Sequence, residues 1–271
     1  MKTELPLAAG TCVVAGQILA LGEAPNGVDA VLGFLTGFFV SGAAMISNDY
    51  FDLEVDKVNH PQRPLPSRRI SIMETVVMTV LFTIAGLVAA ALLGVQSLGV
   101  AGLIWTVGII YNWRGKDTGL PGNMMVSFSV AMTFVFGGIS VGEIGSGLVL
   151  TFGAMAFIFD LAEEIAGGAT DLEGDAMRSV RSLARSRGKM FAIRTSCLLL
   201  AAFICLTFVP YMTGWLGTSY LVLIVPTDMA VGYFAYGLLK IKTPEEGRRV
   251  KRLLYITLVV FVVALIVSRL I

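Results

Sequence analysis

The stretch AVLGFLTGFFVSGAAMISNDYFDLEVD, residues 30–56, joins an apolar segment directly to an acidic one. Its first part, Ala30–Ser47, has no charged residue and suits a helix that crosses a bilayer, which needs ~20 largely apolar residues. Its second part carries a cluster of carboxylates: Asp49, Asp52, Glu54 and Asp56. A membrane helix that ends in such a cluster raises the question of which cation the cluster binds.

The composition indicates that the whole chain belongs in a membrane. Hydrophobic residues make up 56% of its 271 residues and charged residues 14%, whereas charged residues alone make up about 25% of an average soluble domain. The three cysteines lie in apolar runs and lack the spacing of a metal site or a disulfide framework. We therefore expect an integral membrane protein that contacts membrane lipids and does not bind nucleic acid.

The uncharged runs predict an all-α, polytopic membrane protein with nine transmembrane helices around a central cavity, formed as a single domain over residues 1–271. Two of the runs are too long for one helix, and the segments Gly94–Gly99 and Pro210–Gly217 divide them. The expected helices lie within Leu5–Gly22, Ala30–Ser47, Thr75–Trp113 (two helices), Thr118–Gly142, Ile144–Phe159, Thr195–Thr227 (two helices) and about Leu253 to the end.

The basic residues fall in alternate connections of this arrangement. Every connection from an even to an odd helix lies on the face of the N-terminus, and that face receives every lysine and arginine except Arg269. Short loops rich in Lys and Arg remain in the cytoplasm. We therefore expect a multi-pass protein of the cell membrane whose acidic motifs, and hence its active site, face the cytoplasm.

The first acidic motif has the spacing of a cation site. Asn48, Asp52 and Asp56 are four residues apart, so a helix would place an amide and two carboxylates on one side. Such oxygen donors repel one another unless a cation lies among them, and Mg²⁺ typically combines one or two carboxylates with substrate phosphate oxygens. These three side chains are our first candidates for metal ligands.

A second acidic cluster follows the sixth expected helix. Asp160, Glu164, Asp171 and Asp175 would share one face if that helix continued through Gly167 and Gly168, although the two glycines could instead bend it. Both clusters would reach the cytoplasmic face. Two such clusters can hold two or more Mg²⁺ ions around a diphosphate.

The two motifs resemble those of a known family. Residues 48–67, NDYFDLEVDKVNHPQRPLPS, resemble the first signature of the UbiA-type intramembrane prenyltransferases, and Asp171–Asp175, DLEGD, resembles the second. The likeness extends over the whole chain and is strongest to the archaeal members that make ether lipids. The chain departs from the pattern at Gly167 and Gly168, where relatives often carry a polar or basic residue, and at Arg68, where a glycine often stands.

The resemblance implies an Mg²⁺-dependent transferase. It would move a geranylgeranyl group from its diphosphate to geranylgeranylglyceryl phosphate, a lipid-phosphate acceptor, and form an ether bond. In this interpretation Asp52, Asp56, Asp171 and Asp175 would be catalytic through the metal. Diphosphate oxygens would be bound by basic loop residues, with Arg63 favoured because three prolines stiffen its loop. The expected substrate-binding residues are Arg63, Lys116, Arg178, Tyr111, Asn123 and Asp228.

Several of these assignments have alternatives that the sequence leaves open: any one of the basic loop residues could serve to set the topology in the membrane instead of binding diphosphate. Tyr111 and the neighbouring Trp113 could stabilise an allylic cation or belong to an interfacial aromatic belt. Asp228 is an ionisable residue deep in a predicted span and is expected to line a polar cavity. Glu164 is our candidate for positioning or deprotonating the acceptor hydroxyl, and pairing with a loop arginine is its alternative role.

Two other functions compete with the ether-lipid assignment. A transferase of the same family could prenylate an aromatic ring, as in quinone or chlorophyll-type pathways; the basic residues between Arg178 and Lys189 weakly favour a phosphorylated acceptor. A divalent-cation transporter would need acidic residues along a path through the membrane. Most of the acidic residues lie instead at one face of the membrane, and Asp228 is the main exception deep in a span.

Overall fold

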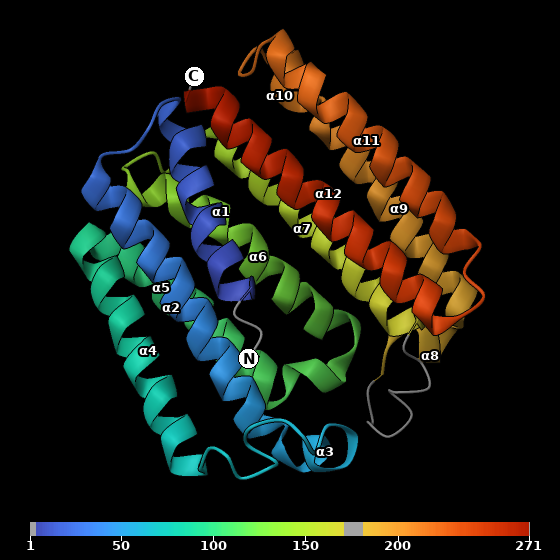
Figure 1. The fold of residues 1–271 in the computed structure, drawn as a ribbon. Helices are drawn as coiled ribbons and strands as arrows, with labels where there is room; N and C mark the ends of the chain where they lie inside the picture. Colours follow the sequence, from blue (N-terminus) through green and yellow to red (C-terminus); the bar gives the residue numbers. More distant parts are fainter. Residues whose placement is uncertain (1–3, 171–180, 271) are drawn as a thin grey trace. The chain divides into compact units, whose positions relative to one another are not determined.

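The computed structural model describes residues 4–170 and 181–270, and within these ranges the chain forms helices and turns without a strand (Figure 1). The long helices are α1 (Glu4–Leu21), α2 (Gly27–Phe51), α4 (Ile72–Leu93), α5 (Val95–Trp113), α6 (Leu120–Ser140), α7 (Gly147–Thr170), α9 (Lys189–Thr207), α11 (Thr218–Leu239) and α12 (Pro244–Leu270). The short ones are α3 (Leu53–Asn59), η1 (Gly115–Thr118), α8 (Leu183–Arg187) and α10 (Val209–Met212).

Most of the long helices can cross a membrane. Among the described residues, 8 helices are long and apolar enough to do so. Helix α7 is not one of them, because Asp160, Glu163 and Glu164 lie in its second half. The prediction of an all-α, polytopic membrane protein is confirmed, whereas the count of nine spans and the central cavity stay predictions.

The described residues form two compact units, and we describe each by itself. The first unit comprises those in Met1–Leu21, Pro25–Arg114 and Met132–Ile144. Helix α2 packs against α1, α4 and α5 within it. Small residues let α1 and α2 approach closely: a Cβ atom on Gly37 would lie 2.9 Å from the backbone oxygen of Ala9.

The second unit comprises the described residues in Gly22–Ala24, Gly115–Ala131 and Gly145–Ile271. Figure 1 shows α7, α9, α11 and α12, coloured from yellow to red, lying alongside one another. The rings of Phe152, Tyr220 and Phe261 join α7, α11 and α12, with the centroids of Phe152 and Phe261 6.4 Å apart. Helix α6 contributes its first half to this unit and its second half to the other.

The breaks between helices fall where turn-forming residues were found. Gly94 separates α4 from α5 with a φ angle of 129°, which residues with a side chain rarely adopt. Gly214, at a φ angle of 75°, lies in the connection from α10 to α11. Both breaks lie in the predicted segments.

The start of α12 was predicted wrongly. The helix begins at Pro244, whereas we expected it near Leu253, because we assigned the charged residues that follow Pro244 to a loop. The backbone N–H of Glu246 donates to Thr243 Oγ1 (3.3 Å), and the Glu246 carboxylate accepts from the N–H of Thr243 (3.4 Å). Threonine followed by proline and, three residues on, glutamate is the sequence signature of a capped helix start.

The last turn of α12 contacts the connection between α1 and α2. Arg269 Nη2 donates to the backbone oxygen of Gly22 at 3.2 Å. This hydrogen bond lies within the second unit, because Gly22–Ala24 belongs to that unit.

Candidate functional site

The first acidic motif lies on a nearly continuous helix. Asp52 is the cap residue between α2 and α3, with φ −90° and ψ 1°. Its backbone N–H nevertheless donates to the backbone oxygen of Asn48 (2.9 Å), and its backbone oxygen accepts from the N–H of Asp56 (2.8 Å). Helical hydrogen bonding thus passes through the break. Asn48, Asp52 and Asp56 therefore occupy successive turns on one side, as their spacing predicts.

The two aspartates of this motif are almost completely buried. Asp52 is 6% exposed and Asp56 0% exposed. Arg63 Nη1 donates to Asp56 Oδ2 at 2.6 Å, but Asp56 Oδ1 is buried without a hydrogen-bond partner in the described structure. A buried carboxylate oxygen without a hydrogen-bond donor lowers the stability of the fold unless a ligand supplies its missing partner.

Asn112, which the sequence analysis did not single out, holds the amide of the motif. Asn48 Nδ2 donates to Asn112 Oδ1 at 3.1 Å, so that Asn48 keeps its Oδ1 as an acceptor. Asn112 Nδ2 in turn donates to Ala44 O (2.7 Å) and Ser47 Oγ (2.9 Å). Through these bonds α5 fixes the orientation of Asn48 on α2.

The proline-rich loop after α3 folds back on itself. The N–H of Arg63 donates to His60 O (3.0 Å), and the N–H of Arg69 donates to Pro64 O (2.9 Å). Arg68 has a φ angle of 58°, the only positive φ outside glycine in the described residues. The departure from glycine at this position therefore places an arginine in the left-handed region that glycine occupies without strain.

The second acidic segment begins on α7, which continues as a regular helix through Gly167 and Gly168 to Thr170. Asp160 and Glu164 are one turn apart on this helix. Asp160 Oδ2 accepts from Ser127 Oγ of α6 at 2.8 Å. Among the described residues Glu164 forms no salt bridge, so the expected alternative of an arginine partner is not found there.

The neighbouring glutamate does have a basic partner. Glu163 Oε1 lies 3.8 Å from Lys251 Nζ of α12. A Cβ atom on Gly167 would lie only 2.6 Å from the same amine. The glycine that departs from the family pattern thus leaves space for a basic group that α12 supplies.

Asp171, Asp175 and Arg178 lie outside the described residues. Within residues 4–170 and 181–270, no three His, Cys, Asp or Glu side chains gather closely enough to form a metal site alone. The metal ligands of the second motif therefore stay predictions from the sequence.

The other expected substrate-binding residues lie near helix ends. Tyr111 lies in the last turn of α5, Lys116 in η1 and Asn123 in the first turn of α6. Trp113 is 59% exposed, and the guanidinium of Arg114 stacks 4.6 Å from its ring centroid. This exposed pair fits the aromatic-belt interpretation of Trp113.

Asp228 belongs to α11 and contacts the end of α9, within the second unit. It is 7% exposed, and its Oδ2 accepts from Thr207 Oγ1 at 2.8 Å, while Oδ1 is buried without a partner in the described structure. Tyr220 donates to the backbone oxygen of Thr207 at 2.8 Å. The carboxylate thus belongs to a polar contact between two helices, and its role toward a substrate stays a prediction.

The donor set of the first motif suits a hard divalent cation. It offers the amide oxygen of Asn48 and the carboxylates of Asp52 and Asp56, all of which are oxygen ligands. Arg63 neutralises one of the two buried carboxylates, and a buried oxygen of Asp56 remains without a donor among the described residues. Mg²⁺ with the phosphate oxygens of a substrate would satisfy this arrangement.

Comparisons with known proteins agree with this chemistry. The sequence model of the UbiA prenyltransferase family matches residues 9–266. The digeranylgeranylglyceryl phosphate synthase of Thermococcus kodakarensis is 31% identical over 98% of the chain and 94% of its own length. A solved structure from a study of digeranylgeranylglyceryl phosphate synthase in membranes has a TM-score of 0.81 and 26% identity, covering 99% of this chain and 98% of that one.

A more distant structure carries ligands. The structure of a UbiA homologue from Archaeoglobus fulgidus bound to GPP and Mg²⁺ has a TM-score of 0.67 and 16% identity, covering 98% of this chain and 99% of that one. At this identity the likeness concerns the fold.

Proposed function

The chain belongs to the UbiA prenyltransferase family, and from this premise we propose that it transfers a geranylgeranyl group from its diphosphate to the glycerol hydroxyl of geranylgeranylglyceryl phosphate. The observation that carries the chemistry is the Asn48, Asp52 and Asp56 set, in which both aspartates are buried and an oxygen of Asp56 lacks a donor within the described structure. The likeness to digeranylgeranylglyceryl phosphate synthase over nearly the full chain supports the choice of acceptor.

We propose that Asn48, Asp52 and Asp56, together with Asp171 and Asp175 of the second motif, would hold Mg²⁺. Bound there, the ion would neutralise the diphosphate and make it a better leaving group. The homologue bound to GPP and Mg²⁺ supports this ligand chemistry. Arg63 holds Asp56 in place through Nη1, and its side chain, 34% exposed, has further N–H groups for a diphosphate oxygen.

The transfer itself exchanges one C–O bond for another. The bond between C1 of the geranylgeranyl group and the diphosphate oxygen breaks, and the electron pair leaves with the diphosphate. The acceptor hydroxyl oxygen forms the new ether bond to C1, and its proton must pass to a base. We assign this proton to the carboxylate of Glu164, which has no salt-bridge partner in the described residues.

The assignment is tested by incubating purified protein with radiolabelled geranylgeranyl diphosphate and one acceptor at a time. We expect an ether product from geranylgeranylglyceryl phosphate. A product from 4-hydroxybenzoate alone would retain the transferase assignment and refute the ether-lipid assignment.

Replacement of Asn112 by alanine should weaken Mg²⁺ binding rather than unfold the protein. Without the bonds of Asn112, the Asn48 amide can rotate, so we expect the Mg²⁺ concentration for half-maximal activity to rise roughly 10- to 100-fold. Thr106→Ala on the same helix is the control, because the Thr106 hydroxyl bonds only to Gly102 O of its own helix. An unchanged Mg²⁺ dependence of Asn112→Ala would contradict this positioning role.

We further propose that the motif loops face the cytoplasm of the cell membrane, as the distribution of Lys and Arg predicts. In a variant without native cysteines, single cysteines at the exposed positions Gln62 and Lys242 should react with a membrane-impermeant thiol reagent only from the cytoplasmic side. A cysteine at exposed Ala24 should react only from the opposite side. Labelling of Gln62 and Ala24 positions from one side would refute the topology.

A further inference from the structure

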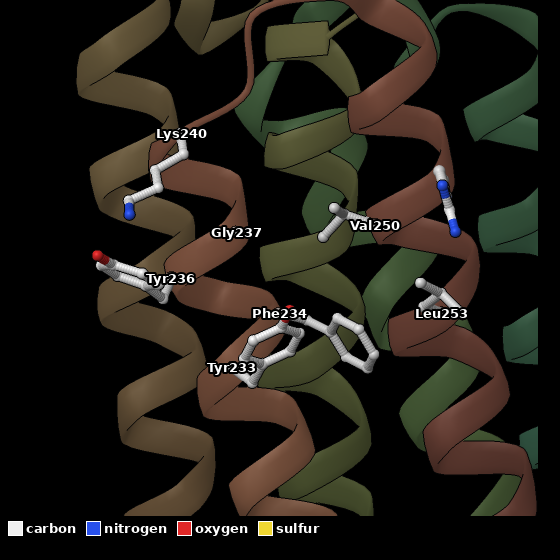
Figure 2. A pocket seen from close by; sticks show the side chains of 8 residues that line it. Tyr233, Phe234, Tyr236, Gly237, Lys240, Val250 and Leu253 are labelled. Atoms are coloured by element: carbon white, nitrogen blue, oxygen red, sulfur yellow. The ribbon is translucent and has the colours of Figure 1, made fainter.

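A groove of about 480 Å³ lies between α11 and α12, away from the acidic motifs in sequence. The lining residues on α11 are three and four positions apart and therefore lie on one face of that helix. The lining residues on α12 have the same spacing and also share one face. Figure 2 shows the aromatic side chains of α11 and the aliphatic side chains of α12 along it. The lining residues are Tyr233, Phe234, Tyr236 and Gly237 of α11, Lys240 at the C-terminal cap of α11, and Arg249, Val250 and Leu253 of α12.

The two basic residues of the groove have no carboxylate partner in the described part of the chain. Neither Lys240 nor Arg249 forms a salt bridge there. The amine of Lys240 lies 4.2 Å from the ring centroid of Tyr236, a contact that leaves its charge uncompensated. Two positive charges at one apolar groove favour an anionic ligand.

The nearest glutamates in the sequence are already engaged elsewhere. Glu245 Oε1 accepts from Arg248 Nη2 at 2.9 Å. Glu246 Oε2 accepts from the backbone N–H of Lys242 at 2.8 Å. Neither carboxylate forms a salt bridge with Lys240 or Arg249 in the described structure.

The side chains of the groove change from charged to apolar along its length, as they do across a membrane interface. Lys240 caps the C-terminal end of α11 and Arg249 lies in the second turn of α12, whereas Tyr233 and Leu253 lie further along the two spans. Tyr233 is 72% exposed and Tyr236 is 56% exposed, which is typical of aromatic side chains that face lipid at a membrane interface. A ligand with a charged head and apolar chains would match this order.

The groove lies on a different face of α12 from the residue that contacts α7. Lys251, two residues after Arg249, reaches Glu163 of α7. At about 100° per residue, positions two apart point in nearly opposite directions. The basic residues of the groove are thus separate from the acidic face of α7.

We propose that this groove binds an anionic membrane phospholipid, with its charged headgroup at the end of the groove that carries Lys240 and Arg249 and its chains along Tyr233, Phe234 and Leu253. The volume lies within the range of small-ligand sites. The site is additional to the proposed transfer reaction and does not depend on it. Its occupant would fill the space between the last two described helices and stabilise their packing.

Native mass spectrometry of the full chain in detergent tests the proposal, with dioleoylphosphatidylglycerol as the anionic probe and dioleoylphosphatidylcholine as the zwitterionic one. We expect tighter binding of the anionic probe and a roughly 30-fold loss of its affinity in Lys240→Gln/Arg249→Gln, the factor that two basic residues contribute near anionic lipid. The control Lys242→Gln/Arg252→Gln removes two exposed charges that do not line the groove.

A second variant tests the groove without changing its charge. A Cβ atom on Gly237 would lie 3.7 Å from Val250 Cγ2, an ordinary contact, so Gly237→Leu is expected to fold and to fill the groove. It should lose the anionic probe as well. Unchanged binding in both variants would overturn the proposal, and so would equal losses in the control. Binding of monooleoylglycerol phosphate without binding of phosphatidylglycerol would also overturn it and indicate an acceptor site.

Discussion

Asp56→Asn is expected to lower prenyl transfer by roughly a thousandfold, which corresponds to losing about 4 kcal/mol of transition-state stabilisation through the metal. The asparagine keeps the shape of the side chain but removes the negative charge from a site that is 0% exposed. The donor's diphosphate charge would then be poorly compensated. The measurement is the rate of product formation from radiolabelled geranylgeranyl diphosphate at saturating Mg²⁺.

The matched control for this variant is Glu54→Gln, two residues earlier. The side chain of Glu54 is 80% exposed and pairs with Lys57 at the surface, so its loss should change the rate little. Thermal unfolding of both variants separates a loss of metal from a loss of fold, because Asp56 also pairs with Arg63. Turnover of a folded Asp56→Asn protein near the normal rate would contradict the metal assignment.

The second motif can be tested in the same assay. Asp175→Asn, at a position outside the described residues, should have an effect of the same order if Asp175 is a metal ligand as the sequence predicts. Normal turnover of this variant would restrict the metal ligands to the first motif.

Glu164→Gln is expected to lower ether formation by roughly 10²–10⁴-fold, the range typical of general acid–base catalysis. Binding of the donor and its slow hydrolysis without acceptor should persist, because neither needs the acceptor's proton to be removed. The measurements are the rate of ether formation, the affinity for the donor and the rate of diphosphate release in the absence of acceptor.

Glu163→Gln is the matched control, since the two glutamates are adjacent on α7 but differ in their partners. Glu163 pairs with Lys251 at 3.8 Å, whereas Glu164 has no salt bridge in the described structure. We expect Glu163→Gln to retain ether formation to a larger extent than Glu164→Gln. If donor hydrolysis and ether formation fall together in Glu164→Gln, together with thermal stability, Glu164 has a structural role instead.

The parts of the fold that the sequence predicted are those that follow from local patterns. The uncharged run before Ser47 predicts a spanning helix, and the four-residue spacing of Asn48, Asp52 and Asp56 predicts a common side of that helix. The observed hydrogen bonds through Asp52 agree with both. Gly94 likewise marks the break that its sequence context predicts.

The parts that it missed depend on contacts between residues distant in the chain. Asn112 lies 64 residues from Asn48, and no local period connects a single asparagine at the end of an apolar run with an amide on another helix. The amine of Lys251 beside Gly167 is a contact of the same kind. The start of α12 was missed for another reason: its charged first turns outweighed a capping signal that the sequence does contain.

The central claim is that the acceptor is a phosphorylated glycerol lipid, and a competition assay tests it most directly. One reaction would contain purified protein, Mg²⁺, radiolabelled geranylgeranyl diphosphate and equal concentrations of geranylgeranylglyceryl phosphate, geranylgeranylglycerol and 4-hydroxybenzoate. Chromatography of the labelled products measures the choice of acceptor. We predict that the label appears in the ether of geranylgeranylglyceryl phosphate and disappears from it when EDTA removes the metal. Label mainly in 4-hydroxybenzoate would contradict the claim.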